Sequence, residues 1–287
     1  MIVYFAKFAA FSAFAVFWGV AVFVAQTVGP EKGYLLIDGG GVPREVTQRF
    51  VALAGGSDAN VVFIPTAQSD DQLEKAGFLQ GHGRGLLQSW GINPDHVTML
   101  HTRDRAQANS VDFVKALQRA SGVVILGGRQ WRLADAYLDT AVEREIKALL
   151  RRGGVVFGSS AGATIQGSFL VRGAAGTPQN PDGDNTIMVS PGHERGFGLL
   201  SNSAIDQHIN TRGREHDLVS VIKEHPELLG IGIDEGAWIE MHGDFFTVFG
   251  GRVVIHDVIR NSSYYFLSPG EKFDLRCVHV KGTCGGN

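Results

Sequence analysis

The chain has 287 residues, which is enough for one large α/β domain or two small ones. Its hydrophobic content of 44% and charged content of 19% are typical of a globular protein with a substantial core. A net charge of −3 and the lack of any Lys/Arg run argue against nucleic-acid binding. The sequence also has no zinc-type Cys/His spacing, so we expect neither a metal nor a nucleic-acid partner.

The first thirty residues differ from the rest of the chain. Residues 8–28 are an uncharged run rich in Phe, Ala and Val, long enough to cross a bilayer as a helix. The run also resembles a secretory signal, although its apolar core is long and Phe23-Val24-Ala25 is a poor cleavage site. We expect residues 1–30 to be a signal peptide or, if uncleaved, a membrane anchor. Residues 31–287 would then form an exported or membrane-anchored domain.

Two cysteines, Cys277 and Cys284, lie near the C-terminus. In an exported protein they could close a small disulfide loop. The alternative is a pair of free thiols on the tail, and the spacing alone leaves both open.

Beyond Glu31, short apolar segments alternate with amphipathic ones. This pattern predicts a parallel sheet with helices on both faces, because parallel strands are buried on both sides. The expected architecture is a doubly wound, mostly parallel α/β sandwich with its site at the carboxyl ends of the strands. Strands are predicted at 33–38, 60–65, 96–101, 122–126 and just before Gly158, and helices at 45–54, 79–90, 111–120, 131–138 and 142–151.

The alternation stops in the last third of the chain. Residues 172–198 are rich in Gly, Pro, Asn and Asp and are predicted to form a long loop bordering the site. From Ile231 onward the pattern is that of β-strands, at 232–234, 237–241, 245–249 and 253–259. Because the sequence has no internal repeat and no clear linker, we expect one catalytic domain.

The segment Gly158-Ser159-Ser160-Ala161-Gly162 carries the strongest functional motif, the Gly-x-Ser-x-Gly nucleophile elbow. Such a serine projects from a strained strand-to-helix turn, and small neighbours keep other side chains away from it. The following backbone N–H and the helix N-terminus suit a developing oxyanion. In a chain with 38 glycines the alternative is a purely structural turn. The motif therefore indicates acyl transfer only if a base accompanies it.

A nucleophilic serine needs a base, and the base needs an acid that orients it. His208 is the best of ten histidines, because its strand-like segment also carries Asp206 and two arginines. The acid is expected at Asp234 or Glu235, which end an apolar strand and point to opposite faces. The order serine, histidine, acid differs from that of α/β-hydrolases. Two histidines in or near loops remain as weaker candidates for the base: His193 and His216.

Several blocks in order resemble the cyanophycinase and aspartyl dipeptidase (dipeptidase E-like) family of serine peptidases. That family's fold is similar to the class I glutamine amidotransferases, with serine in place of cysteine at the elbow. The resemblance extends from Gly33 to Asp257. Its blocks are Gly33–Gly41, Ile64–Ala67, Gly127–Gln130, Gly158–Ala163, Asp206–Arg214 and Gly230–Glu235.

The resemblance implies a role for individual residues. Ser160 would be the nucleophile, His208 the general base and Glu235 the acid, and no cofactor would be needed. The backbone N–H groups of Gly128 and Ala161 would form the oxyanion hole. The substrate would be cyanophycin or another acidic or isoaspartyl peptide, since arginines bind carboxylates bidentately. The residues implied to line its pocket are Gln130, Asp206, Gln207, Arg212 and Arg214.

The chain departs from the family pattern at two positions. A third arginine of the family is replaced by Asp217, and the Phe after the histidine is replaced by Ile209. Asp217 reverses a charge expected near the substrate, which puts β-aspartyl-arginine specificity in doubt. The alternative function is a catalytically silent binding or surface protein on the same fold. A homodimer is also left open.

Overall fold

The computed structural model describes residues 28–75, 77–257 and 264–278. The predicted signal or anchor segment lies almost wholly outside this range. Within the described residues, no helix is both long enough and apolar enough to span a membrane. The role of residues 1–30 therefore stays a prediction.

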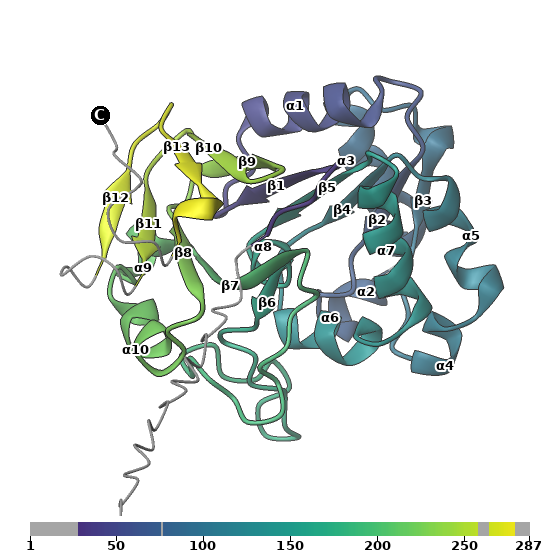
Figure 1. Ribbon diagram of the computed structural model, residues 1–287. Coiled ribbons are helices and arrows are strands. Elements are labelled where there is room, and N and C mark those ends of the chain that lie inside the picture. The colour runs from purple at the N-terminus through teal and green to yellow at the C-terminus, as the bar shows by residue number, and fades with distance from the viewer. Residues whose placement is uncertain (1–27, 76, 258–263, 279–287) are drawn as a thin grey trace, which may run out of the picture.

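A mixed sheet of eight strands forms the centre of the domain, in the order β13-β10-β9-β1-β5-β4-β2-β3 (Figure 1). Five of its strands are parallel, as expected, and the remaining three are antiparallel. The parallel strands are β1 (Tyr34–Asp38), β2 (Val61–Ile64), β3 (Val97–Met99), β4 (Gly122–Ile125) and β5 (Val155–Ser159). The antiparallel strands are β9 (Trp238–His242), β10 (Phe245–Phe249) and β13 (Lys272–Asp274).

A second sheet of five strands corrects the expectation of a single doubly wound sheet. Its order is β12-β11-β8-β7-β6, and β7 and β8 pair in parallel with Asp206 opposite Gly232. A short apolar run predicts a buried strand but carries no signal of which sheet it joins. The strands are β6 (Gly167–Phe169), β7 (Leu200–Gln207), β8 (Leu229–Ile233), β11 (Val253–His256) and β12 (Tyr265–Leu267).

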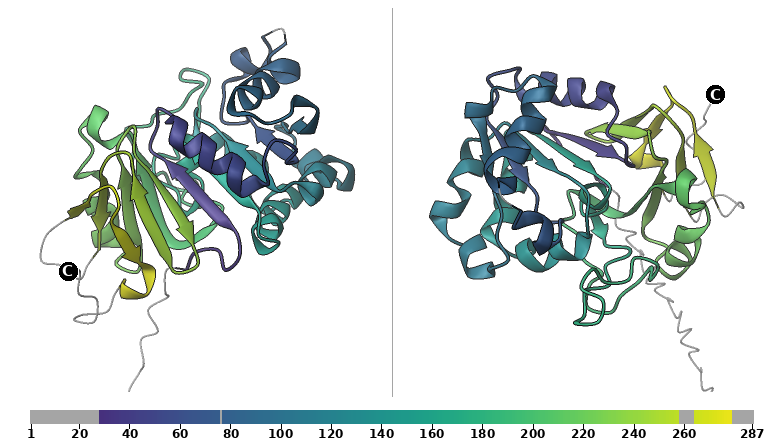
Figure 2. Two further views of the ribbon diagram at one scale, coloured as in Figure 1. Left: turned by 90° about the horizontal axis from the view of Figure 1, so that it is seen from above. Right: turned by 180° about the vertical axis from the view of Figure 1, so that it is seen from behind.

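Helices cover both faces of the larger sheet (Figure 2). One face is covered by α1 (Arg44–Ala54) and α3 (Gly83–Trp90), with a π-helical turn at Phe78–His82 before α3. The other is covered by α5 (Val111–Arg119), α6 (Gln130–Tyr137) and α7 (Ala141–Arg151), while α10 (Asp217–Glu224) covers the second sheet. The short helices are α2 (Asp70–Leu73), α4 (Arg105–Ala108), α8 (Ala161–Thr164) and α9 (Ile209–Arg212).

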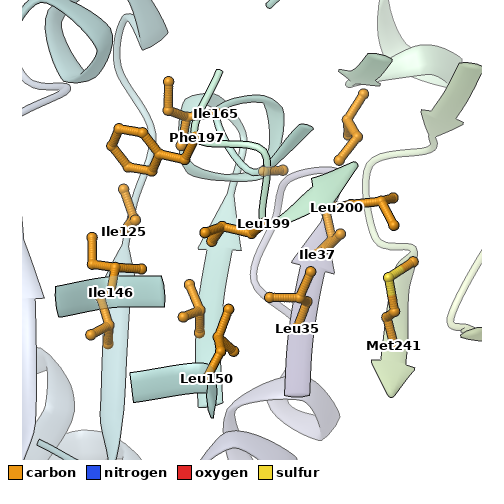
Figure 3. Close-up of a cluster of buried hydrophobic side chains, with 14 of the residues drawn as sticks. Leu35, Ile37, Ile125, Ile146, Leu150, Ile165, Phe197, Leu199, Leu200 and Met241 are labelled. Carbon is orange, nitrogen blue, oxygen red and sulfur yellow. The ribbon is translucent and has the colours of Figure 1, made fainter. Parts of the chain in front are cut away.

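Alternation along the strands divides the core between the two faces. In β1, Leu36 packs in the cluster beneath α1, whereas Leu35 and Ile37 point to the opposite side. Figure 3 shows that second cluster, where Leu35 and Ile37 lie near Leu199 and Leu200, at the start of β7 in the second sheet. The two sheets therefore share one core and form one folding unit.

The loop predicted at 172–198 is confirmed, since it contains no helix and only an isolated bridge at Arg195. It is tied to α6 through Asp182, whose carboxylate lies 2.7 Å from the Arg132 guanidinium. Trp131 Nε1 also donates to the Asp182 carbonyl at 3.0 Å. These contacts fix one end of the loop beside the helix that follows Gly128.

Cys277 is disulfide-bonded. The predicted partner, Cys284, lies outside the described residues. Cys277 is therefore not a free thiol.

Candidate active site

Ser160 lies at the turn between β5 and α8, as the elbow motif predicts. Its backbone has φ 56° and ψ −116°, a conformation that side-chain-bearing residues adopt only at a cost. Gly158 and Gly162 make the turn possible, because a methyl group at Gly158 would overlap the Gly162 carbonyl and one at Gly162 would overlap the Ile125 carbonyl. The two glycines of the motif thus serve close backbone packing around the serine.

Ser160, His208 and Glu235 are hydrogen-bonded in series. His208 Nε2 lies 3.0 Å from Ser160 Oγ, and His208 Nδ1 lies 2.8 Å from Glu235 Oε2. This is the geometry in which an imidazole can take a proton from a hydroxyl while a carboxylate fixes its tautomer. The other acid left open by the sequence, Asp234, is buried and pairs with Arg252 at 3.0 Å instead.

The end of β1 holds the backbone of all three segments. Ser160 N donates to the carbonyl of Asp38 at 3.1 Å, and His208 N donates to that of Gly39 at 2.9 Å. The N–H of Gly236, next to Glu235, donates to the Gly40 carbonyl at 2.8 Å. Three consecutive carbonyls therefore set the spacing of the three candidate catalytic side chains.

Gly40 also forms the surface on which the His208 ring rests. A methyl group at Gly40 would overlap ring atoms Cε1 and Nδ1 of His208. Gly40 has φ +128°, a conformation that suits glycine. His208 itself adopts the left-handed region, with φ 55° and ψ 37°, as the chain leaves β7 and enters α9. The glycine run and this turn together aim the imidazole at Ser160.

Glu235 is held by the first turn of α9. Thr211 Oγ1 donates to Glu235 Oε2 at 3.1 Å, and the Glu235 N–H donates to Asn210 Oδ1 at 2.8 Å. The hydrogen bond with His208 holds the pKa of Glu235 below its usual value, and the bond from Thr211 lowers it further. Glu235 is therefore a carboxylate at neutral pH, as an acceptor for the imidazole N–H must be.

The ring of His208 is half-buried between charges of both signs. Burial lowers the pKa of His208 below its usual value, although the hydrogen bond with Glu235 raises it. The positive charges of Arg212 and Arg214 lower it again. A lowered pKa keeps the imidazole neutral near pH 7, which is the form that accepts a proton.

The predicted oxyanion donors lie beside the serine. Gly127 faces Ser160 so closely that a methyl group on it would lie 3.4 Å from Oγ. Gly128 follows in the same turn, while Ala161 begins α8, where a backbone N–H has no partner within the helix. Among the described residues, neither the Gly128 nor the Ala161 N–H has a recorded hydrogen-bond acceptor. The role of both groups as oxyanion donors stays a prediction.

The predicted pocket residues do not all face solvent. Asp206 is fully buried and takes a bidentate pair of bonds from Arg172, each 2.9 Å long. Gln130 is also buried and donates to the Val171 carbonyl at 2.9 Å. Arg214 donates to the Gln207 carbonyl at 3.2 Å, and burial lowers its pKa to about 10. Arg212, by contrast, lies on the exposed side of α9.

Asp217, the residue that departs from the family pattern, is neutralised by an arginine. Its carboxylate lies 2.5 Å from Arg172 Nη2, and the same guanidinium holds Asp206. The reversed charge therefore belongs to an ion cluster in which Arg172 and Asp206 are buried and the Asp217 side chain is 35% exposed. Sequence reasoning did not identify Arg172 because it lies in an irregular segment with no motif around it.

The model of Peptidase family S51 matches residues 35–249 of this chain. The chain belongs to that family. It is similar to cyanophycinase from Nostoc sp., at 29% identity over 81% of this chain and 80% of that protein. Cyanophycinase from Geminocystis herdmanii is 30% identical over 75% of each chain. Peptidase E from Escherichia coli is 25% identical over 77% of this chain and 85% of that protein.

Solved structures agree with this assignment at the level of the fold. A peptidase from an acI-B1 Actinobacterium superposes with a TM-score of 0.65 at 22% identity, covering 86% of this chain and 98% of that one. The resemblance inferred from the sequence blocks is thereby confirmed. Membership of the family identifies the chain as a serine-type peptidase.

Asp38 is a second residue that sequence reasoning missed. It is fully buried at the end of β1, and its Oδ2 accepts bonds from Ser159 Oγ and from the Gly40 N–H. Its Oδ1 is buried and has no recorded partner. Burial raises the pKa of Asp38 to about 6. A sequence signal existed, since an acid that ends an apolar strand before three glycines is unusual.

Gly40→Ala tests whether the glycine positions the imidazole. The added methyl group must displace the His208 ring, and a displacement of about 1 Å at a catalytic group reduces turnover by about 100-fold. The measurement is kcat/KM, with Gly55→Ala as the matched control. Gly55 has a similar positive φ of 110° but nothing within 4 Å of the added methyl group. Equal activity in the two variants would contradict this role for Gly40.

Asp38→Asn tests the effect of the buried carboxyl group on stability. Because folding raises the pKa of Asp38 from 3.8 to about 6, the folded state binds the proton more tightly than the unfolded state. The stabilisation is complete below pH 3.8 and is lost as pH rises through 6. The loss is about 3 kcal/mol, at 1.36 kcal/mol per pKa unit.

The measurement for Asp38 is the free energy of unfolding in urea from pH 4 to pH 7. Wild type should lose stability relative to Asp38→Asn across this range, whereas the exposed-site control Asp71→Asn should follow wild type. Parallel curves for wild type and Asp38→Asn would rule out the raised pKa.

Proposed function

We propose that this peptidase hydrolyses peptide bonds at aspartyl residues through a Ser160-His208-Glu235 triad and an acyl-enzyme. The observation that carries the proposal is the hydrogen-bonded series itself, with 3.0 Å from serine to histidine and 2.8 Å from histidine to glutamate. The series is built on a strained elbow whose adjacent N–H groups lack partners among the described residues. Proteins named cyanophycinase and peptidase E are its relatives, which supports a peptide substrate.

The first half of the proposed reaction forms the acyl-enzyme. Ser160 Oγ attacks the scissile carbonyl carbon while His208 Nε2 takes the hydroxyl proton. The carbonyl oxygen becomes an oxyanion held by the N–H groups of Gly128 and Ala161. When the tetrahedral intermediate collapses, the C–N bond breaks and His208 gives its proton to the leaving amine. Glu235 stays ionised and stabilises the imidazolium throughout.

The second half restores the enzyme. Water enters where the amine has left and attacks the ester carbon, while His208 again takes a proton. Collapse of this intermediate breaks the bond to Ser160 Oγ, which recovers the proton from His208. The product leaves as a carboxylate. Apart from this water, every group that the steps use belongs to the chain or the substrate.

The aspartyl part of the proposal rests on charge. Arg212 ends the one-turn helix α9, which begins directly after His208, and its positive charge lowers the pKa of both His208 and Glu235. An exposed guanidinium next to the base would attract a substrate carboxylate. Cyanophycin and isoaspartyl or acidic peptides all offer one. We also propose that residues 1–30 deliver the domain outside the cytoplasm or anchor it at a membrane.

Ser160→Ala should abolish peptide hydrolysis. Triad members act as a unit, so loss of the nucleophile alone lowers kcat by about a millionfold. The measurement is hydrolysis of cyanophycin and of β-Asp-Arg and α-Asp dipeptides by residues 31–287, with Ser89→Ala on the surface of α3 as control. Labelling by a fluorophosphonate should be lost in Ser160→Ala alone.

The same experiment separates the peptidase from a catalytically silent binding protein. Turnover that persists in Ser160→Ala would disprove the mechanism. Wild-type protein that neither cleaves these substrates nor reacts with the fluorophosphonate would support the silent alternative. Labelling without cleavage would instead indicate an active serine with a different substrate.

The pH dependence of kcat/KM should report the state of His208. Protonated His208 cannot act as a base, and its lowered pKa places the acidic limb of the profile below about pH 6.5, the ordinary value. In Glu235→Gln the limb should move to lower pH, because the carboxylate that raises the pKa is lost. The plateau should fall by about 100- to 10,000-fold.

The control for Glu235→Gln is Glu74→Gln, which removes an equal charge from an exposed site. It should leave the position of the acidic limb in place. If Glu235→Gln keeps the wild-type limb and plateau, Glu235 is not the partner of the base.

A further inference from the structure

Two arginines converge on one amide beside the candidate triad. Arg129 Nη1 lies 2.8 Å and Arg212 Nη1 3.3 Å from the Asn185 side-chain amide, which is assigned with its oxygen toward both. Asn185 comes from the loop 172–198, and its backbone carbonyl accepts a bond of 2.7 Å from Arg172. A neutral oxygen is therefore the shared acceptor of two cations.

Neither of these guanidinium groups has a carboxylate partner among the described residues. The neighbouring arginines differ, since Arg172 pairs with Asp206 and Asp217, and Arg214 lies 3.7 Å from Asp206. Asp184 is an acid whose carboxylate interacts electrostatically with Arg129. Its pKa is lowered mainly by hydrogen bonds from Thr186 and to a smaller extent by the Arg129 charge, without an ion pair.

Both arginines come from chain segments that directly follow proposed catalytic groups. Arg129 directly follows Gly128, and its backbone N–H is fixed by the Ala67 carbonyl at 2.8 Å. Arg212 ends the short helix that begins after His208. The two arginines therefore come from the turn proposed as the oxyanion hole and from α9, the helix that begins after the proposed base His208.

We propose that Arg129, Arg212 and Asn185 form a carboxylate-binding subsite that selects acidic substrates, with Arg129 as its specificity-determining residue. The inference rests on the proposed function and names its substrate class. Two like charges near a neutral oxygen repel each other, and an anion between them removes that repulsion. A carboxylate would replace two ordinary hydrogen bonds with charge-assisted ones, which are about twice as strong.

The subsite also disfavours one class of ligand. A substrate group that carries a guanidinium or an ammonium would meet two positive charges there, neither of which forms an ion pair among the described residues. Peptides with a carboxylate at this position should therefore be cleaved in preference to their amide or cationic counterparts. The Asn185 side chain is the neutral group that a substrate carboxylate would displace or join.

Arg129→Gln and Asn185→Asp test the subsite from opposite directions. The first removes one cation, and the second places a permanent carboxylate between the two arginines. Both should lower the ratio of kcat/KM for Asp-Leu to that for Asn-Leu by about 10- to 100-fold, the range for a lost bond to a charged group. Arg119→Gln, an exposed arginine on α5, is the charge-matched control.

A binding assay distinguishes failure of the subsite from failure of the proposed function. Succinate binding to Ser160→Ala is measured by calorimetry, with Arg129→Gln, Asn185→Asp or Arg119→Gln added to this background. Succinate binding that is lost with Arg129→Gln and Asn185→Asp but kept with Arg119→Gln supports the subsite. If wild type at the same time cleaves neither dipeptide, only the aspartyl peptidase function is rejected.

Two results would overturn the subsite. One is an unchanged Asp-Leu to Asn-Leu ratio in both variants of a wild-type enzyme that cleaves these dipeptides. The other is that Ser160→Ala does not bind succinate, or that it binds succinate equally well with each of the three added substitutions. Circular dichroism melting of each variant confirms folding, and Asn185→Asp, which is nearly isosteric, keeps the test valid if Arg129→Gln does not fold.

Discussion

Three successive carbonyl groups at the end of β1 determine the geometry of the site. The carbonyls of Asp38, Gly39 and Gly40 accept the N–H groups of Ser160, His208 and Gly236. Because backbone atoms make these bonds, the spacing of the serine, histidine and glutamate depends on the path of the chain through one turn. Glycine allows that path and leaves room for the imidazole above it.

The charged groups around the site are of two kinds, those in ion pairs and those without a charged partner among the described residues. Arg172, Asp206 and Asp217 form a cluster of paired charges, in which Arg172 and Asp206 are buried and Asp217 is partly exposed. Such a cluster adds little net stability, because desolvation offsets much of its attraction, but it fixes the end of β7. Arg129 and Arg212 have no carboxylate partner among the described residues, and both contact the Asn185 side-chain amide. The paired charges thus fix the strand that leads to His208, while the other two arginines contact only a neutral group in this part of the site.

The sequence predicted the local parts of this structure more fully than the long-range parts. Helices α1, α5, α6 and α7 begin and end within one residue of their predicted ranges, because their apolar periodicity is regular. The elbow and the choice of His208 came from compact motifs. The second sheet was not predicted, because the pairing of β8 with β7 and with β11 depends on contacts between distant segments. The partners of Asp38 and Arg172 are also distant, at 121 and 34 residues, so the sequence could not show what these side chains contact.

The division of the site between two sheets has a consequence for how the protein acquires reactivity. Ser160 follows a strand of the larger sheet, whereas His208 and Glu235 follow strands of the smaller one. A chain that has formed only one sheet carries a serine without a base, and long-range strand pairing is a slow event in folding. In the proposed triad, the hydroxyl therefore becomes nucleophilic only when the two sheets dock. A chain that is still folding would have no activated serine.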